Sequence, residues 1–87
     1  MTFLSEFTTS ASKYIRKLDT ITKRRIEDRV NKLEENPFPQ DIERVGMFEN
    51  ELLFRVRVGD QRILYIVRKN QNKLIIVKVD KRSRVYD

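Results

Sequence analysis

The sequence predicts an α+β domain, in which an N-terminal strand and a two-helix hairpin precede an antiparallel sheet of three to four strands. Apolar residues recur at helical spacing in the first part of the chain and alternate with polar residues in the second, and a proline-containing turn separates the two patterns. Two amphipathic helices on one sheet face bury both apolar surfaces and leave the other sheet face open. The 87 residues contain no repeat, linker or low-complexity tract, so we expect a single domain over residues 1–87.

The chain is expected to begin with a short strand and a helix. Residues 2–8 fit a strand whose apolar surface comes largely from Phe3 and Phe7. Any of three hydroxyl residues can cap the helix that follows: Thr8, Thr9 or Ser10. The apolar stripe of this helix falls at i, i+3, i+4 and i+7, and consists of Ala11, Tyr14, Ile15 and Leu18.

A second, longer helix is expected after Asp19-Thr20, a pair typical of a helix cap. Its charged residues face outward, and its inward residues are Ile26, Val30 and Leu33. The helix ends near Asn36, because a residue before proline is pushed out of helical geometry. Residues 37–41 then form a turn that redirects the chain.

Alternation of apolar and polar residues at 52–58, 62–68 and 74–80 predicts an antiparallel meander. The length of the loop before the last strand decides which face each of its side chains takes. A three-residue loop, Asn70–Asn72, aims Ile75, Val77 and Val79 at the helices and leaves Lys78 on the opposite face. An even-numbered loop would bury Lys78 at high cost, so we expect the three-residue loop.

The most informative segment is a hairpin that gathers three arginines on one face. If Gly59-Asp60 is a two-residue turn, Val58 opposes Gln61 and Arg57 opposes Arg62. Alternation then places Arg55 on the same face as that arginine pair, and the apolar residues Phe54, Val56, Val58 and Ile63 on the other. Like charges directly opposite each other destabilise a sheet, so folding alone gives no reason for this arrangement.

The distribution of charge points the same way. Residues 1–50 hold nine basic and nine acidic side chains, whereas residues 51–87 hold ten basic and four acidic ones, which is the whole net charge of +6. Charge confined to one segment is typical of a surface that binds phosphate or an acidic protein, and the plain alternative is a solvated basic face. The binding interpretation requires that the arginines converge and are not each neutralised by an internal carboxylate.

Composition excludes several kinds of chemistry. The chain has no Cys and no His, so a zinc site of the usual kind and an imidazole base are excluded, and we expect neither a metal nor a cofactor. The N-terminus lacks the pattern of a signal peptide, and the longest apolar run, Ile63–Val67, is far too short to span a membrane. We therefore expect a cytoplasmic protein with no membrane partner.

The order and spacing of several short motifs resemble those of the RelE/ParE toxins of prokaryotic toxin–antitoxin systems. The matching segments, in chain order, are Asn36-Pro37, Arg44-Val45-Gly46, residues 54–62, Tyr65 and Arg82-Ser83-Arg84-Val85-Tyr86. The sequence departs from the family pattern at Gln61, where an aromatic residue is usual, and at Asp80-Lys81, where many relatives have a histidine. The resemblance implies a RelE-like fold with the same order of elements.

RelE-type members are ribosome-dependent endoribonucleases that cut messenger RNA in the decoding site, and the basic residues of this chain favour that type. The resemblance implies a catalytic set of Arg55, Arg57, Arg62, Arg82 and Tyr86, of which we keep the last four as catalytic. We assign RNA or phosphate binding to Arg55, Lys78, Lys81 and Arg84. The resemblance also implies a cognate antitoxin, in a heterodimer or heterotetramer, with the ribosome and messenger RNA as further partners. ParE-type members share the fold but inhibit DNA gyrase without nuclease activity, and a non-toxic nucleic-acid-binding module is a third alternative.

Without histidine, the predicted chemistry depends on charge and positioning. Arginine is a poor base but binds phosphate oxygens bidentately, so we expect Arg57, Arg62 and Arg82 to hold the scissile phosphate and stabilise its transition state. Tyr86 is expected to carry a proton or stack on a base, although packing of the last strand is an equally good explanation. Tyr14 and Tyr65 are interpreted as core-edge aromatics.

Overall fold

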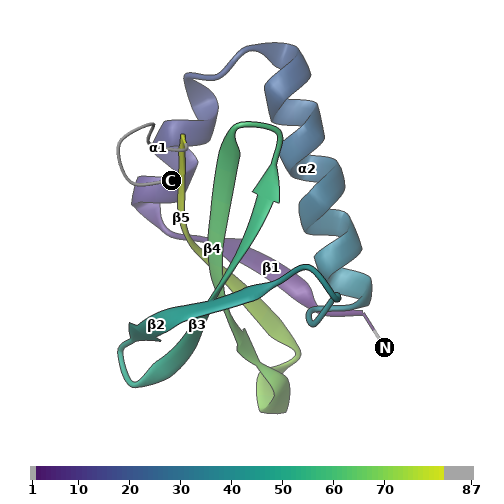
Figure 1. Ribbon diagram of the computed structural model, residues 1–87, viewed down its shortest axis with the longest axis vertical. Coiled ribbons are helices and arrows are strands. Elements are labelled where there is room, and N and C mark those ends of the chain that lie inside the picture. Colours follow the sequence, from purple (N-terminus) through teal and green to yellow (C-terminus); the bar gives the residue numbers. More distant parts are fainter. Residues whose placement is uncertain (1, 82–87) are drawn as a thin grey trace.

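A computed structural model describes residues 2–81 (Figure 1). Its elements are β1 (Leu4–Phe7), α1 (Thr9–Arg16), α2 (Thr20–Glu35), β2 (Glu43–Phe48), β3 (Glu51–Val58), β4 (Gln61–Arg68), a 3₁₀ turn η1 (Lys69–Gln71) and β5 (Lys73–Lys81). The strands form one five-stranded sheet in the order β1-β5-β4-β3-β2. β1 runs parallel to β5, and all other neighbours are antiparallel. The predicted α+β class and order of elements are confirmed, in a mixed sheet that contains one strand, β2, which the alternation does not mark.

Both helices begin where the sequence predicts and α2 also ends there, whereas α1 ends at Arg16 and leaves Leu18, predicted as the last residue of its apolar stripe, outside the helix. Thr8 and Asp19 are the N-caps of α1 and α2, and each side chain accepts a hydrogen bond from an amide of the first turn. Such caps stabilise a helix by about 1 kcal/mol. α2 ends at Glu35, and Asn36 is already extended because Pro37 follows it. Within residues 2–81, no helix combines the length and the hydropathy needed to cross a membrane.

The core lies between the two helices and one face of the sheet. Tyr65 is at its centre: the ring is fully buried, and the hydroxyl donates a hydrogen bond of 2.8 Å to the carbonyl of Pro37. The helices contribute Ala11, Ile26, Val30 and Leu33, and the strands contribute Val56, Ile63, Leu74, Ile76 and Val79. The inward residues predicted for α2 are therefore confirmed, and Tyr65 lies deeper than the predicted core edge.

The predicted loop before the last strand is wrong. Arg68 pairs with Lys73, so the connection has four residues rather than three, and Asn72 closes it in the left-handed region (φ 52°). An even-numbered loop turns Ile75 away from the helices and brings Leu74 and Ile76 into the core.

A β-bulge then reverses the alternation along β5. Tyr65 pairs with Ile76 and Leu64 pairs with Lys78, which leaves Val77 as the extra residue. After the bulge, Val79 points into the core as predicted, and Lys78 lies on the opposite face, exposed. The prediction for Val77 is wrong, and the expected face of Lys78 is correct for a different reason.

β2 lies at the edge of the sheet and extends, with the β2–β3 turn, away from both helices (Figure 1). Five of its six residues are exposed, so no buried face imposes an alternating pattern on the sequence. A second bulge, between Arg44 and Gly46, also breaks the period of two, with Gly46 at φ 149°. Alternation therefore could not reveal this strand.

Candidate phosphate-binding site

The register of the β3–β4 hairpin is the one that the sequence predicts. Val58 pairs with Gln61, and Arg57 pairs with Arg62, across a turn in which Gly59 has φ 60°. Because Val56 and Ile63 are buried in the core, the arginines lie on the face that the helices do not cover. With Lys78 they form what we call the basic face: Arg55, Arg57, Arg62 and Lys78.

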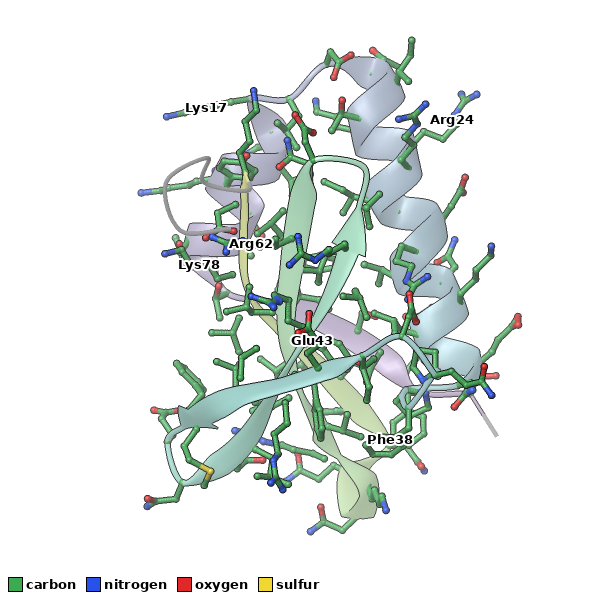
Figure 2. The ribbon with its side chains drawn as sticks, viewed as in Figure 1. Lys17, Arg24, Phe38, Glu43, Arg62 and Lys78 are labelled. Atoms are coloured by element: carbon green, nitrogen blue, oxygen red, sulfur yellow. The ribbon has the colours of Figure 1, made fainter. Side chains whose placement is uncertain are left out.

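Each end of the basic face also holds a carboxylate. Asp80 lies directly opposite Arg62 in the β4–β5 pair. Its Oδ1 accepts a hydrogen bond of 2.9 Å from Nε of Arg62, and its Oδ2 accepts one of 3.2 Å from Nη2. The ammonium group of Lys78 lies 3.8 Å from Oδ2 of the same carboxylate. Figure 2 shows Arg62 and Lys78 beside β5, with Glu43 below them.

Glu43 lies opposite Arg55 in the β2–β3 pair. Its Oε1 accepts a hydrogen bond of 2.7 Å from Arg55 and lies 4.0 Å from Nε of Arg57. The hydrogen bond from Arg55 and the charge of Arg57 lower the pKa of Glu43, so this carboxylate is ionised at neutral pH. Its side chain remains 54% exposed, on the edge strand.

The binding interpretation requires that the arginines are not each neutralised by an internal carboxylate, yet each of the three has one within 4.0 Å. Arg55 and Arg57 share Glu43, and Arg62 pairs with Asp80. The basic face still has four cations against two carboxylates. Arg57 and Lys78 are the more exposed cations, at 38% and 57%, and their nearest carboxylate oxygens are 4.0 and 3.8 Å away. A net positive surface therefore remains, with Arg57 and Lys78 the most accessible of its cations.

Lys81, the one remaining candidate within residues 2–81, does not join this group. Lys81 pairs with Gln61 on the opposite side of the sheet from Asp80, and its ammonium lies 3.6 Å from Asp60 in the hairpin turn. The three remaining candidates lie outside the described residues: Arg82, Arg84 and Tyr86.

Gln61, at the position where the family usually has an aromatic residue, serves the core. It is 6% exposed, and its Oε1 accepts a hydrogen bond of 2.7 Å from the hydroxyl of Tyr14. Burial raises the pKa of Tyr14, so its phenol stays neutral and links α1 to the hairpin. The interpretation of Tyr14 as a core-edge aromatic agrees with this contact.

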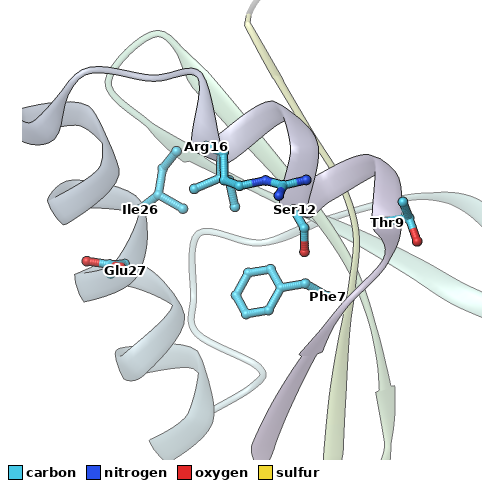
Figure 3. A pocket seen from close by; sticks show the side chains of 7 residues that line it. Phe7, Thr9, Ser12, Arg16, Ile26 and Glu27 are labelled. Carbon is cyan, nitrogen blue, oxygen red and sulfur yellow. The ribbon is translucent and has the colours of Figure 1, made fainter.

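The described residues line several hollows away from the basic face, two of which contain several large apolar side chains. One, of about 510 Å³, is open between α1, α2 and the end of β1, and Figure 3 shows Phe7, Arg16 and Ile26 around it. The other has a similar volume and lies beside Phe38 and Phe54. Among residues 2–81, no cluster of side chains is suited to hold a metal ion.

Comparison with known proteins identifies the family. The sequence model of the family described as "ParE toxin of type II toxin-antitoxin system, parDE" matches residues 5–86, and solved RelE toxins share the fold. The chain belongs to the RelE/ParE toxin superfamily of type II toxin–antitoxin systems. Among curated protein sequences, none matches this toxin.

Solved structures of RelE toxins cover nearly the whole toxin. The archaeal RelE–RelB complex from Pyrococcus horikoshii matches with 26% identity and a TM-score of 0.83, over 97% of this chain and 99% of that one. The intact RelBE toxin–antitoxin complex of E. coli matches with 21% identity and a TM-score of 0.77, over 94% and 99%. A YoeB/ParE toxin from Agrobacterium tumefaciens has 15% identity and a TM-score of 0.77, over 93% and 100%.

Sequence reasoning missed the two carboxylates of the site. Asp80 had a usable signal, because it follows Lys78 by two residues in one strand and must share its face. Glu43 had none, because its place opposite Arg55 depends on a β2–β3 turn formed by Glu49 and Asn50, both with positive φ.

Proposed function

We propose that this toxin is a ribosome-dependent endoribonuclease that cleaves messenger RNA in the decoding site and so inhibits translation. One observation carries the proposal: an ionised, half-exposed carboxylate, Glu43, stands among the cations of an open sheet face. Cleavage of RNA by its own 2′-hydroxyl needs cations around the phosphate and a group that accepts the hydroxyl proton. The basic face supplies both.

In the proposed reaction, the 2′-oxygen attacks phosphorus and the bond from phosphorus to the 5′-oxygen breaks. The products are a 2′,3′-cyclic phosphate and a 5′-hydroxyl. Glu43 accepts the 2′-hydroxyl proton, while Arg57, Arg62 and Lys78 bind the non-bridging oxygens and offset the charge that grows on them. The 5′-oxygen takes a proton as it leaves, and Tyr86 stays the predicted donor.

A carboxylate whose pKa is lowered is a weak base, so the acid–base part of this site is modest. Alignment of the 2′-oxygen with the scissile bond must supply the rest, and effective molarities for well-aligned groups reach about 10⁵–10⁸ M. A free RNA strand is rarely aligned in this way. A ribosome that fixes the strand supports a nuclease of this design.

We propose that a cognate antitoxin silences the toxin, as a heterodimer or heterotetramer. The matching RelE structures from Pyrococcus horikoshii and E. coli are complexes of a toxin with its antitoxin. Because the basic face keeps a net positive charge, the segment of antitoxin that covers it is expected to be acidic.

A second candidate function follows from the family description, which names a ParE toxin. In that alternative the toxin inhibits DNA gyrase without cleaving RNA, and the basic face contacts that enzyme or its DNA. Fold alone does not separate the two functions, because members with either activity share it.

The deciding experiment adds the purified toxin to ribosomes programmed with a defined message and maps the message ends by primer extension. The proposal expects cuts within the codon in the decoding site, and none in the same message without ribosomes. A parallel assay measures supercoiling by gyrase. Intact messages together with inhibited supercoiling would reject the nuclease and support the ParE-type alternative.

A further inference from the structure

Among the contacts within residues 2–81, Asp80 holds Arg62 more firmly than any other group holds a cation of the basic face. The two groups form a fork through both carboxylate oxygens, and their side chains are only 25% and 18% exposed. A guanidinium held through two parallel hydrogen bonds is fixed in plane and direction, which a single ion pair does not achieve. The orientation of Arg62 is therefore set before any ligand arrives.

A β-bulge in β5 places the carboxylate of Asp80 on the basic face. Without the β5 bulge at Val77, continued alternation would turn Asp80 toward the helix side. The bulge is held from α1, where Thr8 donates a hydroxyl hydrogen bond of 2.7 Å to the carbonyl of Val77 and an amide hydrogen bond of 3.1 Å to that of Ile76. Bulges of this kind commonly re-aim side chains beside active sites.

A carboxylate in this position has a cost for RNA binding. Asp80 lies within 4 Å of both Arg62 and Lys78, so it offsets their charge and repels a phosphate that approaches them. A surface designed only to bind RNA tightly would have a neutral residue here. The acid makes sense where the direction of Arg62 matters more than affinity.

We propose that Asp80 is a positioning residue that aims Arg62 at the scissile phosphate and lowers the affinity for RNA in doing so. The inference rests on the proposed nuclease function, because it assigns a role within that site. It predicts that removing the negative charge of Asp80 strengthens RNA binding and at the same time slows cleavage. A carboxylate that only stabilises the fold would not change the two quantities in opposite directions.

The test compares Asp80→Asn with the wild type and with Asp28→Asn, which makes the same change of charge on an exposed position of α2. Binding is measured by fluorescence anisotropy with a labelled single-stranded RNA whose 2′-hydroxyls are methylated, over a series of salt concentrations. Cleavage is measured in a single turnover on programmed ribosomes at saturating toxin. Thermal melting shows whether each variant is folded.

For Asp80→Asn we expect tighter RNA binding, with a slope of log K against log [salt] steeper by about 1. We expect cleavage slower by about 10-fold to 100-fold, the effect of a misplaced group in an aligned site. Asp28→Asn is expected to change binding much less, because α2 packs on the sheet face opposite the basic face and salt screens charges that are far apart. Asp80→Glu keeps the charge, so it should bind RNA as the wild type does and cleave faster than Asp80→Asn.

Other results overturn the inference. If Asp80→Asn weakens binding and cleavage together, or binds more tightly but cleaves at the wild-type rate, Asp80 does not position Arg62. If Asp80→Asn does not fold, Asp80→Glu provides the test. If Asp80→Glu melts like the wild type but cleaves no faster than a catalytically dead variant, a carboxylate at this position does not restore cleavage and the positioning role is wrong. If the wild type itself leaves ribosome-bound messages intact, the proposed nuclease function fails, and the positioning role fails with it whatever the anisotropy shows.

Discussion

The basic face contains two arginine–carboxylate pairs that differ in their place in the sheet and in the number of hydrogen bonds that join them. Arg62 and Asp80 face each other on β4 and β5, in the middle of the sheet, and both side chains are largely buried. Arg55 and Glu43 face each other on β3 and β2, where β2 is the edge strand, and the carboxylate is 54% exposed. Both pairs join a guanidinium group to a carboxylate, but the carboxylate of the edge pair is more exposed than that of the central pair.

This difference separates two roles within one site. A carboxylate with both oxygens engaged by cations in the central strands can fix the direction of an arginine, but neither of its oxygens is left open to a 2′-hydroxyl. Glu43 uses Oε1 for its contacts with Arg55 and Arg57, and within the described part of the chain no hydrogen bond engages Oε2. The edge carboxylate is therefore the more accessible to a 2′-hydroxyl, and the central one the better positioning group.

Glu43→Gln should give the largest effect, because it removes the proton acceptor and keeps the shape of the side chain. We expect cleavage on the ribosome to slow by about 10²–10⁴-fold, the usual contribution of a general base. Binding of single-stranded RNA should be unchanged or tighter, because a negative charge leaves the basic face. Single-turnover cleavage and anisotropy measure the two quantities.

The matched control is Glu49→Gln, which removes the same charge from an exposed position in the β2–β3 turn. Its cleavage rate is expected to stay close to that of the wild type. Equal losses in both variants would show that overall charge, rather than the carboxylate beside Arg55, controls the reaction, and the division of roles between the two pairs would be wrong.

Arg57→Ala should have the next largest effect. Arg57 is the arginine of the basic face with the weakest hold by a carboxylate, so it is the one most able to turn to a phosphate. Loss of one donor to the transition state costs about 10²–10³ in rate. Stability should change by no more than about 0.5 kcal/mol, because the side chain is exposed and lies opposite a like charge.

Cleavage assays and urea unfolding together check this prediction, with Arg44→Ala on the exposed edge strand as the control. A folded Arg57→Ala variant that cuts messages at the wild-type rate would mean that the two paired arginines suffice. The accessibility of Arg57 would then have no catalytic meaning.

Thr8→Ala tests the Arg62–Asp80 pair indirectly, through the β5 bulge that Thr8 holds. The Thr8 side chain caps α1 and holds the β5 bulge, so its loss should destabilise the fold by about 1 kcal/mol, within the usual range for a lost cap. It should also loosen the placement of Asp80 and slow cleavage modestly. Thr8→Ser keeps the hydroxyl and should restore most of both, as measured by urea unfolding and single-turnover cleavage. If Thr8→Ala is destabilised but fully active, the hold of Thr8 on the bulge does not matter for cleavage.

The same contrast explains what the sequence could reveal. Helices and the β3–β4 hairpin follow from local rules, since caps, apolar spacing and the Gly59-Asp60 turn act within a few residues. The faces of β5 depend on a left-handed Asn72 and on a bulge held by Thr8, which is 69 residues away from Val77. Glu43 depends on an edge strand with no buried face to pattern it. The hairpin arginines were therefore predictable, the partner of Arg55 was not, and Asp80 could be predicted only from its spacing to Lys78.

The smallest predicted effect is a change of pKa at Glu43. The hydrogen bond from Arg55 favours the ionised carboxylate and lowers its pKa, so replacing Arg55 with Gln should move that pKa upward toward the ordinary value for glutamate. NMR titration of the side-chain carboxyl carbon measures both values. The sign for stability follows: the pair contributes above the unfolded pKa of the carboxylate, and its contribution is lost as the pH falls through the lower, folded pKa. If the pKa of Glu43 does not rise in Arg55→Gln, the edge carboxylate is not coupled to its arginine, and the two pairs differ in kind rather than only in exposure.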